Sequence, residues 1–415
     1  MSRAARIGIL CLSAAIFGYA GIGHVLGRTQ DEKAYKSLTV YGEVLQKVQS
    51  DYVDDPNMHT VTAGSLHGML ESLDAQSSYL TPREYDEYKK KLANAGTAET
   101  GLTLSKRYGY VIVLSVLPDS PGTKAGIRSG DIFESISGFT TRDMSVGQAL
   151  NLLNGQPGTG IKVGVIRRGK ATPEEVDVVR EKLATPKIIA QKTDPDILVL
   201  RIPSLDAGRA DEIRNRLLEA EKQGIHKIIL DVRECGRGQV SEAISTARLF
   251  ISSGMLTTLR GQTVSAQVFS AEPKQVIWKS PVSVLIDATT SGAAEVLASA
   301  IAANHRGDVV GERTFGLASE QKLITLDDGA ALILTVANYY NPGGKSIMEE
   351  GVTPTEVVRA VPEEDSDNSD EEAAPTPAEG QKEPGLGPRP LSPEDPIFHR
   401  ALDLLKAPAP AKKAA

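Results

Sequence analysis

Between Ile197 and Asn304, apolar strands and amphipathic helices alternate along the chain. Continuous apolar runs predict buried strands, and apolar residues at helical spacing predict helices between them. The predicted strands are residues 197–202, 227–233 and 281–286, and the predicted helices are residues 210–223, 239–249 and 292–304. Strands joined in this way need helical crossovers, so the region predicts an α/β core, with bounds at residues 185–360.

A second compact unit is predicted for residues 97–172. Its strands are expected at residues 111–116, 132–136 and 161–168, with a helix at residues 145–154. The motif Ala125-Gly-Ile-x-x-Gly-Asp131 lies between the first two strands, and its glycines suit a tight turn.

The N-terminus has the pattern of a targeting segment, residues 1–28. Arg3 and Arg6 precede an apolar stretch from Ile7 to Leu26, about long enough to cross a bilayer as a helix. No small-x-small cleavage site is evident, which favours an uncleaved anchor over a cleaved signal. Basic residues before the stretch predict that the rest of the chain lies outside the cytoplasmic membrane, in a periplasm or an equivalent space. Residues 32–95 then have a helical pattern.

The C-terminal region changes composition sharply. Residues 363–372 hold seven acids and no base, and Pro and Gly interrupt the stretch that follows. Residues 362–396 therefore predict a disordered acidic linker. Residues 397–406 predict a terminal helix that docks on the body of the protein.

Composition excludes some function classes. A net charge of −7 argues against nucleic acid as the main partner. Two cysteines, Cys11 and Cys235, do not make a disulfide framework. The six histidines are scattered without a ligand-like pair, so we expect no metal site and no cofactor.

Two stretches in the core domain carry a specific resemblance: Asp287-Ala-Thr-Thr-Ser-Gly-Ala-Ala-Glu295 and Gly311-Glu-Arg-Thr-Phe-Gly-Leu-Ala-Ser-Glu-Gln321. They resemble the nucleophile helix and the following strand of the C-terminal processing peptidases, which use a serine–lysine dyad. The resemblance covers residues from about 36 to 360. It implies an α/β multidomain protein with an N-terminal helical region, a β-rich PDZ domain with short helices and an α/β core of processing-peptidase type.

The unit at residues 97–172 resembles a PDZ domain through its Ala125–Asp131 motif. PDZ domains bind a peptide as an added strand and hold its terminal carboxylate with backbone N–H groups. The resemblance places the carboxylate-binding loop at Gly101, Leu102, Thr103 and Leu104.

The catalytic positions of the resemblance are substituted in this chain. Ungapped alignment places the catalytic serine on Gly292 and the catalytic lysine on Leu317, whereas the supporting glutamine is present as Gln321. A Ser–Lys hydrolase needs a hydroxyl at a helix start and a neutral amine to accept its proton. Gly292 has no side chain, and Leu317 cannot accept a proton.

The oxyanion region also departs from the family pattern. Asp231-Val-Arg-Glu-Cys-Gly-Arg-Gly238 stands where the family shows Asp-Leu-Arg-x-Asn-Pro-Gly-Gly. Arg237 replaces a glycine whose backbone lies near the oxyanion, which would fill the pocket or impose unsuitable backbone angles. Gly238 is retained.

Two substitute nucleophiles need weighing. Ser291 precedes the nucleophile position by one residue, and Lys322 follows Gln321. A shift of one residue turns a side chain by about 100° on a helix and to the opposite face on a strand, so both groups would be misdirected. We expect Ser291 to be a helix N-cap and Lys322 to face solvent. Cys235 has no identifiable base.

The sequence therefore leaves two hypotheses. In the favoured one, the chain is a catalytically degenerate relative that binds protein C-termini or regulates an active peptidase partner, with homo-oligomerisation also open. In the alternative, it is an active serine endopeptidase that cleaves unstructured C-termini with the atypical nucleophile Ser291.

Overall fold

The computed structural model describes residues 36–93, 98–107, 109–167, 170, 172–359 and 395–407. The predicted targeting segment and almost all of the acidic linker lie outside these residues. Contacts divide the chain into two compact units, one up to Ser65 and one from Leu66. Within the described residues, no helix combines the length and the apolar character needed to cross a membrane.

The N-terminal region is helical, as predicted. Residues 36–51 form a helix, and α2 (Met58–Glu71) and α3 (Pro82–Ala93) follow, with the short strand β1 (Ser78–Leu80) between them. Helix α3 begins with a reciprocal cap. The Thr81 N–H donates to Glu84 Oε2 (2.8 Å), and the Glu84 N–H donates to Thr81 Oγ1 (3.4 Å).

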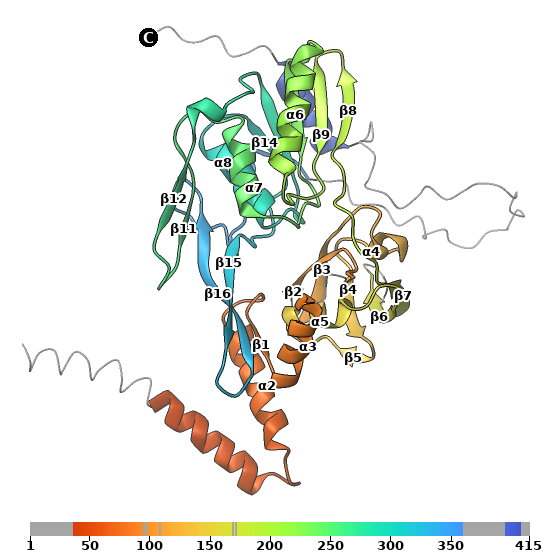
Figure 1. Ribbon diagram of the computed structural model, residues 1–415, viewed down its shortest axis with the longest axis vertical. Helices are drawn as coiled ribbons and strands as arrows, with labels where there is room; N and C mark the ends of the chain where they lie inside the picture. The colour runs from red at the N-terminus through yellow and green to blue at the C-terminus, as the bar shows by residue number, and fades with distance from the viewer. Residues whose placement is uncertain are drawn as a thin grey trace, which may run out of the picture. The chain divides into compact units, whose positions relative to one another are not determined.

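An antiparallel sheet follows α3 within the second unit, in the order β2-β3-β4-β6-β7, with β5 beside β4 (Figure 1). Its strands are β2 (Leu102–Arg107), β3 (Tyr110–Val116), β4 (Ile132–Ile136), β5 (Phe139–Thr140), β6 (Gly160–Ile166) and β7 (Glu174–Val179), and its helices are α4 (Pro121–Lys124) and α5 (Val146–Leu153). Strand β7 lies beyond the predicted end at residue 172. It joins this sheet because Val176 and Val178 alternate into the same core as β6.

The α/β core contains a six-stranded sheet in the order β17-β14-β13-β10-β9-β8. The four central strands pair in parallel, and β8 closes one edge antiparallel to β9. The strands are β8 (Ile189–Asp194), β9 (Ile197–Arg201), β10 (Lys227–Asp231), β13 (Val282–Ile286), β14 (Asp308–Gly311) and β17 (Glu356–Val357). The parallel centre confirms the α/β core predicted from the strand–helix alternation.

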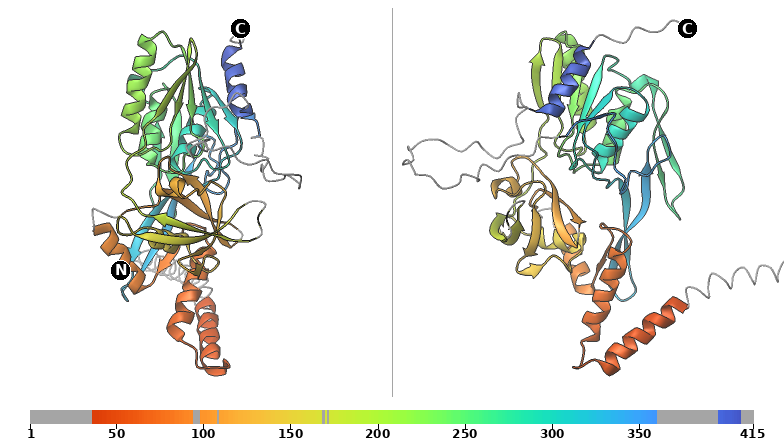
Figure 2. Two further views of the ribbon diagram at one scale, coloured as in Figure 1. Left: turned by 90° about the vertical axis from the view of Figure 1, so that its right-hand side faces the viewer. Right: turned by 180° about the vertical axis from the view of Figure 1, so that it is seen from behind.

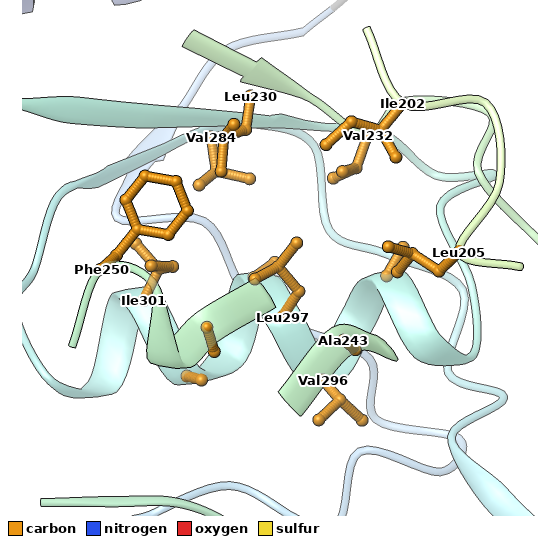
Figure 3. Packing of buried hydrophobic residues seen from close by; sticks show 14 of the residues in the cluster. Ile202, Leu205, Leu230, Val232, Ala243, Phe250, Val284, Val296, Leu297 and Ile301 are labelled. Atoms are coloured by element: carbon orange, nitrogen blue, oxygen red, sulfur yellow. The ribbon is translucent and has the colours of Figure 1, made fainter. Parts of the chain in front are cut away.

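Helices cover both faces of this sheet (Figure 2). One face packs against α6 (Arg209–Lys222), α7 (Val240–Arg248) and α8 (Ala293–Ala303). Figure 3 shows this layer, in which Leu230 and Val284 of the strands face Leu297 and Ile301 of α8. The other face packs against α9 (Pro396–Lys406), so the terminal helix docks as predicted.

Alternation along β9 explains the two cores. Leu198 and Leu200 belong to the cluster under α6 to α8, whereas Ile197 and Val199 belong to the cluster under α9. Strand residues alternate between faces, so a run that is apolar at every position requires cover on both sides.

A separate antiparallel sheet leads away from the core. Strand β16 is its centre and pairs with β1, β11 and β15. The strands not yet described are β11 (Met255–Arg260), β12 (Gln267–Ser270), β15 (Ser319–Thr325) and β16 (Ala331–Tyr340). The start of β15 returns toward α8 and brings residue 317 close to residue 292.

Candidate functional site: a pocket between the PDZ-like domain and the core

Most of the residues proposed from the sequence meet around one pocket of about 430 Å³. One side, which we call the PDZ wall, consists of Leu102, Thr103, Leu104 and Leu150 from β2 and α5. The opposite side, which we call the core wall, comes from the loop after β10, the start of α7, the start of α8 and the start of β15. The core wall consists of Gly236, Arg237, Gly238, Val240, Gly292, Ala293, Leu317, Ala318, Ser319 and Gln321. Gln76 also lines the pocket.

Gly292 is the N-cap of α8 and has the backbone of a strained turn, with φ 63° and ψ −120°. Glycine adopts this conformation without the Cβ penalty that other residues would incur. A Cβ built on Gly292 would have no heavy atom within 4 Å. The space for a side chain is therefore present at the position aligned with the nucleophile, and the side chain itself is absent.

Glu295 holds the segments of Gly292 and Leu317 together. Its carboxylate is fully buried and accepts hydrogen bonds from the N–H groups of Gly292 (2.8 Å), Gly316 (2.6 Å) and Leu317 (2.7 Å). The Thr314 hydroxyl donates a fourth bond (2.5 Å). One carboxylate thus connects the start of α8 to the segment before β15, and it satisfies an N–H at the helix end.

Burial raises the pKa of Glu295 to about 7, although its hydrogen-bond donors act in the opposite direction. Sequence reasoning used this residue only to align the motif. An acid three positions after a helix start was the available signal, because that spacing lets a carboxylate reach back to the N-cap N–H.

Leu317 and Gln321 both line the pocket. Leu317 is held by its backbone, whose N–H donates to Glu295, and its side chain contributes apolar surface where the resemblance expects an amine. The Gln321 side-chain amide donates to the backbone carbonyl of Gln76 (3.2 Å). In this structure, Gln321 therefore fixes the turn after α2.

Ser291 is not the helix N-cap that the sequence predicted, because Gly292 occupies that position. The Ser291 side chain is 1% exposed, and its hydroxyl has no hydrogen-bond partner within the described part of the chain. The Ser291 N–H donates to the Cys235 carbonyl (3.1 Å), which turns the residue toward the loop after β10. The prediction was wrong because the Gly292 N–H, and not the Ser291 N–H, donates to the Glu295 carboxylate, which makes Gly292 the N-cap.

The other alternative groups lack an activating environment. Lys322 is exposed, as expected, and is not part of the pocket lining. Cys235 is buried, and this burial raises the pKa of its thiol to about 12. A thiol held protonated in this way is a poor nucleophile.

Arg237 reaches sideways and forms ion pairs with Glu99 (2.6 Å) and Asp206 (3.2 Å). From the sequence, we expected the Arg237 side chain to fill the pocket or to impose unsuitable backbone angles. It lines the pocket and also links the PDZ-like domain to the core through Glu99. The adjacent Gly238 has φ 145°, and a Cβ there would lie 2.5 Å from the Leu205 Cβ. Gly238 is therefore required by the close approach of Leu205.

The predicted carboxylate-binding loop begins at Gly101, which has φ 78°. A Cβ there would lie 2.3 Å from the Ser120 Cβ, so the turn needs glycine. The next three residues enter β2 and line the pocket, whereas Gly101 does not. Strand β2 is at the edge of its sheet, and the pocket occupies the groove between β2 and α5.

The profile of peptidase family S41 matches residues 196–358, and a PDZ domain profile matches residues 112–167. The chain therefore contains a peptidase family S41 domain and a PDZ domain, and the relatives described next are named carboxy-terminal processing proteases. The S41 match covers the helices and strands that build the core wall, and the PDZ match begins within β3.

Curated relatives agree with this assignment. The chain is 27% identical over 336 residues to a carboxy-terminal-processing protease of Bartonella bacilliformis, covering 79% of this chain and 76% of that protein. It is 26% identical over 361 residues to the carboxy-terminal processing protease CtpA of Bacillus subtilis, covering 85% and 77%.

A solved structure shares the fold. It is the photosystem II D1 C-terminal processing protease, with a TM-score of 0.64 and 23% identity. The match covers 77% of this chain and 92% of that one. This likeness confirms the fold class, a PDZ domain combined with an S41-type α/β core.

Proposed function

We propose that this chain is a catalytically degenerate member of the C-terminal processing protease family that binds protein C-termini. The observation that carries the proposal is the pair Gly292 and Leu317. Both face one pocket at the positions aligned with the nucleophile and its base, and neither can perform that chemistry.

The surrounding scaffold supports binding over catalysis. The strained turn, the buried Glu295 and the free space beside Gly292 remain, so the pocket is open although its reactive groups are missing. Ser291 lacks a base, since Lys322 lies outside the pocket and the Ser291 hydroxyl has no partner among the described residues. These features argue against the alternative of an active endopeptidase that uses Ser291.

The test is proteolysis of an unstructured protein such as casein by the purified full chain. Wild type, Ser291→Ala and the double variant Gly292→Ser/Leu317→Lys run in parallel. We expect no cleavage by wild type or by Ser291→Ala. Activity gained by the double variant would show that only the dyad is missing.

Two other outcomes of this proteolysis test lead to different conclusions. Wild-type cleavage that Ser291→Ala abolishes would overturn the proposal and identify a shifted nucleophile. If wild type and the double variant are both silent, the degenerate assignment stands and the altered oxyanion loop becomes the second defect. Reverting Arg237 to glycine in the double variant then tests that defect.

The location of the protein is part of the same proposal. The basic and apolar pattern of residues 1–28 supports a membrane anchor with the PDZ domain and core on the periplasmic side. Regulation of an active processing protease in the same compartment is the matching role. Fractionation of cells that express the full chain, followed by protease accessibility in spheroplasts, tests the anchor. Recovery of the protein in the cytoplasm would contradict it.

A further inference from the structure

The PDZ wall and the core wall enclose one space, although PDZ peptide binding and peptidase chemistry are usually considered separately. Leu102, Leu104 and Leu150 border the groove between β2 and α5, and Gly292 and Leu317 border the same pocket from the other side. A volume of about 430 Å³ lies within the range of roughly 300–1,000 Å³ that is typical of ligand pockets. It suits the end of a peptide chain.

Strand β2 determines the shape of the ligand. It stands at the end of the sheet order and pairs with β3 on one side only. Its outer backbone groups can therefore pair with an added extended strand. A chain lying along β2 would project successive side chains to opposite faces of the sheet, so that every second side chain points to the face on which α5 and the pocket lie.

The core wall offers space and apolar surface to those side chains. No heavy atom lies within 4 Å of the place for a Cβ on Gly292, and the apolar Leu317 lies at the position aligned with the family's lysine. Ala293 and Ala318 are also small and apolar. Loss of the dyad has thus left a side-chain cavity that a small or medium apolar residue fills without burying a charge.

Charge determines which end of the ligand enters. Arg237 is the single ionisable side chain among the described residues that line the pocket. Helix α8 points its N-terminus at the same space through Gly292 and Ala293, and helix N-termini favour anions. The Ser291 hydroxyl lies next to the start of α8, is buried and has no hydrogen-bond partner in the described residues. It lies 2.9 Å from the place that a Cβ on Gly236 would occupy. Arg237, which also pairs with Glu99 and Asp206, and the start of α8 are complementary to a carboxylate.

We propose that the former catalytic centre is now a subsite for the apolar last residue of a peptide with a free C-terminus, fused to the PDZ groove into one composite binding site. The peptide backbone pairs with β2, its last side chain occupies the space between Gly292 and Leu317, and Arg237 with the start of α8 attracts its carboxylate. This inference rests on the proposed binding function and adds its ligand class and the residues that select it.

The test measures fluorescence anisotropy with the full chain and an N-terminally labelled hexapeptide Gly-Ser-Gly-Ser-Val-Val. The same peptide with a C-terminal amide, and one with aspartate as its last residue, report on charge and side chain. The variants are Leu317→Asn and Gly292→Ala for the core wall and Leu150→Asn for the PDZ wall. Lys322→Gln, on β15 and close to Leu317 in sequence but outside the pocket, is the matched control. Circular dichroism checks that every variant is folded.

We expect the free-acid Val-Val peptide to bind best and the amide and aspartate peptides to bind about tenfold more weakly, a factor equivalent to about 1.4 kcal/mol. Leu317→Asn, Gly292→Ala and Leu150→Asn should each weaken binding about tenfold or more, and Lys322→Gln should bind like wild type. Because two different core-wall variants are used, misfolding of one leaves the other to decide.

Different results would contradict the composite site and the proposed binding function. Wild-type affinity in both core-wall variants, with loss in Leu150→Asn, would overturn the composite site while leaving PDZ binding of C-termini intact. Equal affinity for the acid and the amide would overturn the role of Arg237 and the start of α8. If no peptide bound to wild type, the proposed binding function itself would fall.

Discussion

The PDZ wall and the core wall of the pocket differ in the functional features that their residues retain. The PDZ wall keeps what peptide binding requires: an edge strand, a glycine turn at Gly101 and apolar side chains along β2 and α5. The core wall has a strained turn and a buried carboxylate, but Gly292 and Leu317, which the resemblance aligns with the dyad, contribute no reactive side chain. The comparison teaches that the core wall is held by groups other than the side chains at positions 292 and 317.

Glu295 is the clearest of those groups. It accepts hydrogen bonds from the start of α8 and from the segment before β15, and these bonds do not depend on the side chains at positions 292 and 317, since three of its four donors are backbone N–H groups. A change of side chain at position 292 or 317 therefore leaves these backbone hydrogen bonds in place. Gly238 acts similarly for the loop after β10, through its close approach to Leu205.

The largest expected effect tests whether Glu295 carries the scaffold. Glu295→Ala leaves three N–H groups and a hydroxyl without their acceptor in a buried site. We expect the free energy of unfolding to fall by at least about 3 kcal/mol. Urea denaturation followed by circular dichroism measures it. A loss below about 1 kcal/mol would mean that the core wall is held by other contacts.

The pH dependence of the free energy of unfolding also tests the role of the buried Glu295 carboxyl. Burial raises the pKa of Glu295 from 4.5 to about 7, so between these values the folded protein binds a proton that the unfolded chain releases. This contribution to stability is present below pH 4.5 and is lost as the pH rises to about 7, by about 3 kcal/mol at most. Urea unfolding at several pH values, compared with Glu295→Gln, measures it. An equal slope in both proteins would contradict the assignment.

Gly238→Ala tests whether the loop of the core wall has a unique backbone. A Cβ there would approach the Leu205 Cβ to 2.5 Å, and φ 145° disfavours any L residue. We expect a loss of about 2 kcal/mol in the free energy of unfolding. The matched control is Gly158→Ala, which shares a positive φ of 79° but has open space around the new Cβ. Equal losses in the two variants would show that backbone strain alone matters.

The smallest effect is expected for Gly292→Ser by itself. The added side chain meets no neighbour within 4 Å, so the cost is that of the strained turn, about 1–2 kcal/mol. Thermal unfolding and peptide binding measured together test this expectation. If stability fell much further, the open space beside Gly292 would not exist as described, and both the proposed side-chain subsite and the preserved scaffold would be in error.

Much of the site was foreseeable from the sequence because its elements carry local signals. The Ala125–Asp131 motif located the PDZ domain, and the stretches ending at Glu295 and Gln321 located the start of α8 and of β15. Periodicity predicted three strands and three helices of the core, β9, β10, β13, α6, α7 and α8, to within two residues, whereas β8, β14 and β17 were not predicted. The end of the PDZ sheet was misplaced because β7 follows a polar break near residue 172 and continues the same core.

What only the tertiary structure decided concerns groups that are distant in sequence. Local patterns determined that Gly292 and Leu317 lack reactive groups, since that follows from side-chain chemistry at two positions. They could not reveal that Glu295 binds both segments, that Ser291 turns away from the helix cap, or that Arg237 pairs with Glu99. Hydrogen bonds and ion pairs require distances of about 3 Å, and only the packing of the PDZ domain, the loop after β10 and α8 brings these atoms so close.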